Sequence, residues 1–204
     1  MITKIVSHVE KTILGRVANK IHERRTDNTE VLLEFVMKAE GGNHLEIGTL
    51  FGGSAISVAL LKDVIPQDGF VFCIDPLDGY YTKYASREDM VDTQSKVAVT
   101  PETLFKNIKS FGVGHRIFVM QEYSDRVNEL AGMRFSTAFI DGDHQGETPM
   151  EDWLRVKDHV TQYVIFDNCA NTHPDVVRAC MAAADDPEWE CVYDNDITFV
   201  VGRV

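Results

Sequence analysis

The sequence predicts an α/β protein built on a doubly wound sheet of seven mostly parallel strands, preceded by N-terminal helices. Short apolar runs alternate with stretches of helical periodicity, which is typical of parallel strands covered by helices on both faces. The chain closes with "WECVYDNDITFVVGRV", in which two apolar runs flank a turn-prone "DND" and indicate a β-hairpin. With 204 residues and 44% hydrophobic content, we expect one domain, residues 1–204, with a full core.

Two helices are expected before the sheet. Apolar residues recur at helical spacing from Ile5 to Ile21, and residues 26–42 repeat the pattern until Gly41 and Gly42 stop it. This helical extension, residues 1–42, precedes a core of residues 43–204. Its amphipathic faces either pack on their own domain or form the surface of a homodimer.

Five strands follow in order, ending "HLEIG", "FVFCID", "RIFVMQE", "STAFIDG" and "YVIFDN". Helix starts are legible between them: Thr100 is an expected N-cap before Pro101, and Thr148 begins a capping-box pattern with Glu151. The closing hairpin cannot be a right-handed parallel crossover, so we expect the last strand to be antiparallel.

The least patterned stretch is residues 78–100, which is rich in polar residues and holds three tyrosines. A loop of this length is usually functional. We therefore expect a mobile lid there, in which Tyr80, Tyr81 and Tyr84 stack on an acceptor or simply pack.

The net charge, the cysteines and the N-terminus indicate which partners and which compartment to expect. A net charge of −12 disfavours nucleic acid and anionic membranes, whose binders need a basic face. The four cysteines lie in or beside apolar runs without C-x-x-C spacing, so we expect buried thiols in a reducing compartment. The N-terminus carries charges throughout and shows no signal peptide, which predicts a cytoplasmic protein.

A glycine turn follows the first strand. Gly48, Gly52 and Gly53 lie between "HLEI" and a helix expected to begin near Gly52. Such a turn lets a ligand approach the backbone, and helix-start N–H groups favour an anionic group; strand–helix turns also need glycine for steric reasons alone. The spacing is G-x-x-x-G rather than the dinucleotide pattern G-x-G-x-x-G.

Two acidic residues at strand ends select among cofactors. Asp75 ends the second strand, where a carboxylate can accept hydrogen bonds from both hydroxyls of a ribose. Glu46 supplies an acidic partner for an ammonium. Because nothing nearby is basic enough to hold a pyrophosphate, this set suits S-adenosylmethionine better than NAD.

These residues carry a resemblance. "LEIGTLFGGSA", Asp75, "IDGDH" and "IFDN" resemble the class I S-adenosylmethionine-dependent methyltransferases, specifically the cation-dependent O-methyltransferases of the catechol and caffeoyl-CoA type and their small-domain relatives. The resemblance runs from about His44 to the C-terminus and implies a Rossmann-like fold. For the cofactor, it implies that Glu46, Gly48 and Ser54, with Gly52 in the same turn, contact the methionine portion, that Asp75 binds the ribose, and that Ser124 contacts the adenine. For the metal, it implies that Asp141, Asp167 and Asn168 are the ligands. Asp141 would also contact the cofactor.

The polar ends of "FIDGDH" and "IFDN" are expected to meet. Parallel strands place their carboxyl ends on one edge of a sheet, so Asp141, Asp167 and Asn168 should be neighbours there. Three oxygen ligands without sulfur suit Mg²⁺ or another hard divalent cation. His144 is the candidate general base, and it departs from the resembled plant and animal enzymes, which have lysine there.

The sequence therefore predicts a Mg²⁺-assisted O-methyltransferase acting on a small molecule with vicinal hydroxyls. The absence of a basic cluster argues against a CoA thioester as acceptor. Three alternatives stay open: a metal-independent methyltransferase with a structural Asp-Asn pair, a non-catalytic cofactor-binding protein on the same fold, and a Rossmann-type dehydrogenase. His173 is expected at a helix start, where it either has a structural role alone or also lines the mouth of the substrate site.

Overall fold

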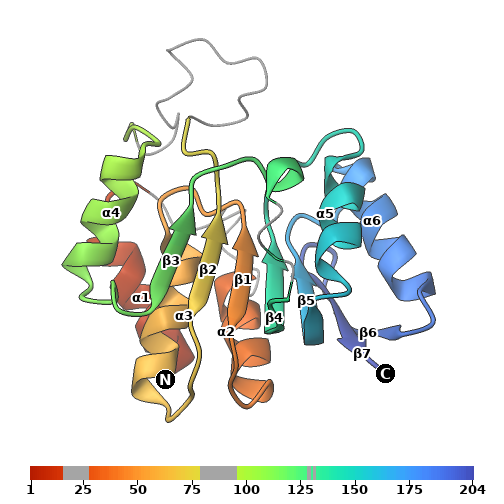
Figure 1. Cartoon of the computed structure of the whole chain (residues 1–204), viewed down its shortest axis with the longest axis horizontal. Helices are drawn as coiled ribbons and strands as arrows, with labels where there is room; N and C mark the ends of the chain where they lie inside the picture. Colours follow the sequence, from red (N-terminus) through yellow and green to blue (C-terminus); the bar gives the residue numbers. More distant parts are fainter. Residues whose placement is uncertain (16–27, 79–95, 128–129, 131) are drawn as a thin grey trace.

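The computed structural model describes residues 1–15, 28–78, 96–127, 130 and 132–204. Within them seven strands form one sheet in the order β3-β2-β1-β4-β5-β7-β6 (Figure 1). The strands are β1 (His44–Ile47), β2 (Val71–Ile74), β3 (Ile117–Met120), β4 (Phe135–Ile140), β5 (Val160–Phe166), β6 (Trp189–Asp194) and β7 (Phe199–Arg203). β7 pairs antiparallel with both β5 and β6, and the other pairs are parallel. The predicted sheet and its antiparallel last strand are confirmed.

Helices cover the sheet on both faces. They are α1 (Ile2–Thr12), α2 (Asn28–Lys38), α3 (Gly53–Val64), α4 (Pro101–Ser110), α5 (Thr148–Val156) and α6 (Pro174–Asp185), with a 3₁₀ turn η3 (Ser124–Arg126). Alternate side chains of each strand enter separate cores, because strand side chains point to opposite faces. Along β5, Ile165 packs with α1, α2 and α3, whereas Val164 and Phe166 pack with α5 and α6.

The first helix is shorter than the periodicity predicts. α1 ends at Thr12, Ile13 is extended, and Gly15 has a left-handed φ of 97°. A Cβ on Gly15 would lie 2.4 Å from the ring of Phe51, so Gly15 lies directly against the β1–α3 turn. The apolar face of α1 is buried in its own domain through Ile5, Val6 and Val9, and the homodimer stays a prediction.

Both predicted helix starts are confirmed, but only one of the two predicted caps is present. The Thr100 hydroxyl accepts a hydrogen bond from the N–H of Thr103 and caps α4. At α5, however, the N-cap is Glu147, and Thr148 is already helical. The Glu147 carboxylate forms an ion pair with Arg178 at 3.0 Å instead of capping the helix.

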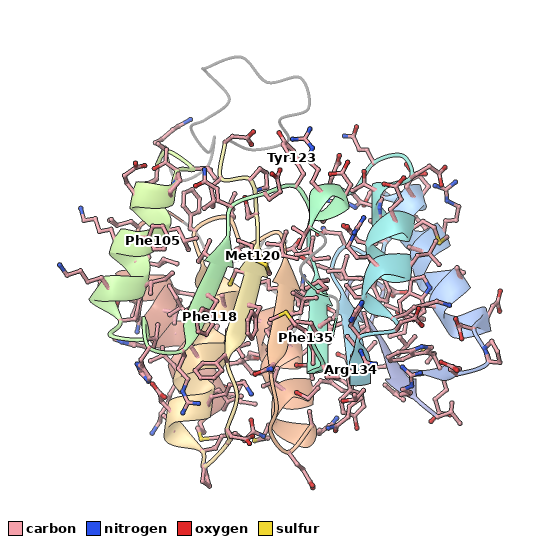
Figure 2. All side chains as sticks on the ribbon, in the orientation of Figure 1. Phe105, Phe118, Met120, Tyr123, Arg134 and Phe135 are labelled. Atoms are coloured by element: carbon pink, nitrogen blue, oxygen red, sulfur yellow. The ribbon has the colours of Figure 1, made fainter. Side chains whose placement is uncertain are left out.

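The described residues cover only thinly the face of β2 and β3 that lies opposite α3 (Figure 1). Phe118 is 50% exposed there, and its ring stacks on Phe72 with centroids 5.2 Å apart. Figure 2 shows Phe118 and Met120 along β3, with Tyr123 beyond its carboxyl end.

Three expectations concern other parts of the chain. Cys73, Cys169 and Cys180 are buried as predicted, but Cys191 is exposed because it lies on the outermost strand, β6. The tyrosines of the expected lid lie in residues 79–95, outside the described residues. Among the helices that the structure describes, none has the length and apolar character needed to cross a membrane.

Candidate active site

The carboxyl ends of β4 and β5 bring Asp141 and Asp167 together. Ile140 and Phe166 are paired in the parallel register, so the next residue of each strand emerges at the same edge of the sheet. The N–H of Asp167 donates to the carbonyl of Ile140 at 3.0 Å. Burial raises the pKa of the Asp167 carboxyl well above its usual value, and the neighbouring charge of Asp141 raises it further. The predicted meeting of the two strand ends is therefore what the structure shows.

Two oxygens at this edge lack a hydrogen bond of ordinary geometry. They are Asp167 Oδ2 and Asn168 Oδ1, which are buried and have no such donor among the described residues, although the Asn168 N–H and the Asp141 carboxyl lie close to the Asp167 carboxyl. Asn168 has a left-handed φ of 57°, a conformation that a short polar side chain tolerates. A buried oxygen without a donor costs free energy unless a ligand satisfies it, so these atoms fit a hard cation.

The ligand set is small. Among the described residues no group of three His, Cys, Asp or Glu side chains is placed to hold a metal. A cation here would thus depend on the amide oxygen of Asn168 beside the two carboxylates, with its remaining positions filled by water or by an acceptor. This composition favours Mg²⁺-like ions over zinc.

His144 faces the carboxyl pair. Its Nε2 lies 3.4 Å from Asp141 Oδ1, and its side chain is 8% exposed. Burial lowers the pKa of His144 below its usual value, while the charges of Asp167 and Asp143 oppose that shift. His173, the N-cap of α6 as predicted, packs its ring edge-on against His144 with centroids 5.2 Å apart. The two rings form one wall beside the carboxyl pair.

The glycine turn is dictated first by the packing of the protein itself. A Cβ on Gly48 would lie 2.0 Å from the carbonyl oxygen of Asp141, and one on Gly52 would lie 2.7 Å from Leu104. Both glycines have left-handed φ angles, 86° and 85°, and Gly52 is the N-cap of α3. The steric reason for these glycines is therefore present, whether or not a ligand also lies against the turn.

Glu46 is a fully buried carboxyl near the carboxyl end of β1. It is 0% exposed, and neither carboxyl oxygen has a hydrogen bond of ordinary geometry from the described residues. Burial raises the pKa of Glu46 to about 8; the nearby hydroxyls of Ser54 and Thr49 oppose this rise, and the charges of Asp141 and Asp75 add to it. A ligand ammonium would satisfy this carboxyl and favour its ionised form.

Asp75 has a structural task that the sequence did not reveal. Its Oδ2 accepts hydrogen bonds from the N–H groups of Thr49 and Leu50, and its Oδ1 accepts one from Leu77, each at 2.7 Å. Leu50 and Leu77 both have left-handed backbones, with φ of 51° and 53°. The carboxylate therefore holds two strained turns in place, and burial raises its pKa.

Ser124, the expected adenine contact, is the first residue of η3 and hydrogen-bonds the carboxyl of Asp152 on α5. Asp152 is 1% exposed, and burial raises its pKa to about 7. Sequence reasoning missed Asp152, because a single acid on an amphipathic helix carries no local signal of burial.

No family model and no curated protein matches the chain. Solved structures do. One is the O-methyltransferase NovP, with a TM-score of 0.66, 17% identity, and coverage of 86% of this chain and 79% of that one. Another is an O-methyltransferase from Bacillus cereus in complex with SAH, with a TM-score of 0.63, 16% identity, and coverage of 100% and 90%.

A third match is a candidate RNA methyltransferase from Pyrococcus horikoshii, with a TM-score of 0.61, 12% identity, and coverage of 100% of this chain and 96% of that one. At such identities the likeness shows the fold. The chain has the Rossmann-like methyltransferase fold that its sequence predicts, and its own residues must decide the chemistry.

Proposed function

We propose that the chain is an S-adenosylmethionine-dependent O-methyltransferase that uses a divalent cation, such as Mg²⁺, and acts on a small molecule with vicinal hydroxyls. The observation that carries this proposal is a pair of buried oxygens beside Asp141 at the ends of β4 and β5, Asp167 Oδ2 and Asn168 Oδ1, which have no hydrogen bond of ordinary geometry from the part of the chain that the structure describes. The solved methyltransferases of the same fold support the cofactor.

Each residue has a role that its surroundings support. Glu46 would bind the ammonium of the cofactor beside Ser54, and Asp75 would keep the turn in shape and accept from the ribose. Asp141, Asp167 and Asn168 would hold the cation, which when bound lowers the pKa of a coordinated hydroxyl. His144 would accept the hydroxyl proton as the oxygen–methyl bond forms and the sulfur–methyl bond breaks.

The acceptor is proposed to be a small molecule rather than a nucleic acid. The candidate RNA methyltransferase of the same fold shows that architecture alone does not separate these substrates. The net charge of −12 favours a small-molecule acceptor, because nucleic-acid binding relies on clustered cations that neutralise phosphates. Vicinal hydroxyls fit because two neighbouring oxygens can share one cation.

The proposal is tested by screening catechols, flavonoids and sugar diols with the cofactor and Mg²⁺, reading methylated product by mass spectrometry. On the best acceptor, excess chelator should abolish most turnover, and Mg²⁺ should restore it. Asp167→Ala and Asn168→Ala should lower kcat by about 100-fold or more while SAH affinity, measured by calorimetry, changes little.

A matched control lies in the same loop. Asp143 follows Asp141 by two residues and accepts a hydrogen bond from the N–H of Gln145, so Asp143→Ala removes a carboxylate without removing a proposed ligand. Full turnover in excess chelator would support the metal-independent alternative instead. Absence of SAH binding would reject the methyltransferase proposal itself.

A further inference from the structure

The N-terminal helix α2 begins at the proposed metal site. Asn28, its first residue, donates its side-chain N–H to Asp167 Oδ1. The amide oxygen of Asn28 accepts a hydrogen bond from the hydroxyl of Thr198 at 2.9 Å. Asn28, Thr198 and Asp167 are 6%, 0% and 1% exposed, so water cannot readily replace any of these contacts.

The chain of contacts determines which way the amide points. An ionised carboxylate only accepts hydrogen bonds, and a bound cation would keep Asp167 in that form. The NH₂ of Asn28 accordingly faces Asp167 in the structure. Its oxygen is then left for the Thr198 hydroxyl, which donates to it. Asp167 uses Oδ1 in this contact, while Oδ2 stays buried and without a hydrogen bond of ordinary geometry from the described residues.

Thr198 is itself held rigidly. Its N–H donates to Asn195 Oδ1 at 2.7 Å, within the turn that precedes β7. The same turn is fastened to the metal-site backbone, because the N–H of Cys169 donates to the carbonyl of Ile197. The hydroxyl that orients Asn28 is thus on a segment bonded to the residue after Asn168.

We propose that Asn28, oriented by Thr198, is a positioning residue that holds one oxygen of Asp167 and leaves the other for the cation. Groups that hydrogen-bond to metal ligands fix their orientation, and removing them weakens metal binding. This inference rests on the proposed function, since it needs a cation at Asp167. It adds the N-terminal extension to the functional site.

The experiment measures Mn²⁺ binding to the full chain by the loss of the free-ion paramagnetic resonance signal, and SAH binding by calorimetry. Asn28→Leu keeps the approximate shape but not the hydrogen bonds, and should raise the Mn²⁺ dissociation constant by about 10- to 100-fold. Thr198→Val should raise it by about tenfold, and Thr198→Ser, which keeps the hydroxyl, should behave as wild type. SAH affinity should change by less than about twofold.

A matched control separates positioning from stability. Thr137 is a buried threonine on β4 whose hydroxyl lies 2.7 Å from Nδ1 of His44, in the strand interior before the carboxyl end. Thr137→Val and Thr198→Val should both lower the melting temperature, but Thr137→Val should leave Mn²⁺ affinity unchanged. If Asn28→Leu binds Mn²⁺ like wild type, or if Thr137→Val weakens binding equally, the positioning role is wrong while the metal site survives. If the wild type binds no Mn²⁺, the metal part of the proposed function fails and this inference with it.

Discussion

Asp152 is a carboxyl group whose burial makes folding depend on pH. Its pKa is raised to about 7 from the ordinary value of 3.8, mainly by burial, so the folded chain holds this proton more tightly than the unfolded chain. The resulting stabilisation is complete below about pH 4 and is lost as the pH rises toward about 7. At pH 8 the folded chain therefore contains a desolvated charge.

The side chain of the Asp152→Asn variant cannot ionise. We therefore expect its free energy of unfolding to exceed that of wild type by about 1–4 kcal/mol at pH 8 and to equal it near pH 4. Urea unfolding at several pH values measures this difference. Asp158→Asn, an exposed carboxylate just beyond the same helix, is the control and should leave the pH profile unchanged. A constant difference between Asp152→Asn and wild type from pH 4 to pH 8 would contradict a raised pKa.

At the scale of elements, Asn107 on α4 joins three segments of the chain. Its amide oxygen accepts from the N–H of Leu14 at 2.9 Å, and its NH₂ donates to the carbonyls of Leu14 and Phe51 at 2.8 and 2.9 Å. Phe51 belongs to the β1–α3 turn, the expected cofactor turn. The segment after α1 is thus bonded to that turn through one buried side chain.

Asn107→Leu should leave three backbone groups unpaired and cost about 3 kcal/mol of unfolding free energy. SAH affinity should fall several-fold as well, because the turn loses a support, and calorimetry beside chemical unfolding reports both effects. Ser110→Ala, which removes one bond to the carbonyl of Asn107 on the same helix, is the control and should spare SAH binding. A destabilised Asn107→Leu variant with unchanged SAH affinity would show that the hydrogen bonds of Asn107 stabilise the fold without supporting cofactor binding.

The sequence predicted the elements whose signals are local. Strand ends, the closing hairpin and the Thr100 cap follow from periodicity and turn chemistry, and the meeting of Asp141 with Asp167 follows from parallel pairing. Contacts between distant segments carry no such signal: Asn28 meets Asp167 across 139 residues, and Asn107 meets Leu14 across 93. The predicted cap at Thr148 was wrong. Glu147 precedes α5 and forms an ion pair with Arg178, a residue distant in sequence, and Thr148 is already helical.

At the scale of the whole molecule, acidic charge is both abundant and concentrated. The chain carries a formal net charge of −12. Glu46, Asp75, Asp141 and Asp167 lie at or near the carboxyl ends of neighbouring strands, β1, β2, β4 and β5, where their mutual repulsion adds to the raised pKa values of Glu46 and Asp167. The ligand-free fold should consequently be stabilised by anything that screens like charges.

We expect raising NaCl from about 0.02 to 0.2 M at pH 8 to stabilise the ligand-free chain by about 1 kcal/mol and to raise its melting temperature by about 2–4 °C, because the screening length shortens below the spacing of surface charges. Differential scanning calorimetry measures the shift. At pH 5, where more carboxyls are protonated and the net charge is smaller, the same salt step should have less effect. A melting temperature that falls with salt at pH 8 would mean that attractive ion pairs, such as Arg116 with Asp63, outweigh the repulsion among the excess carboxylates.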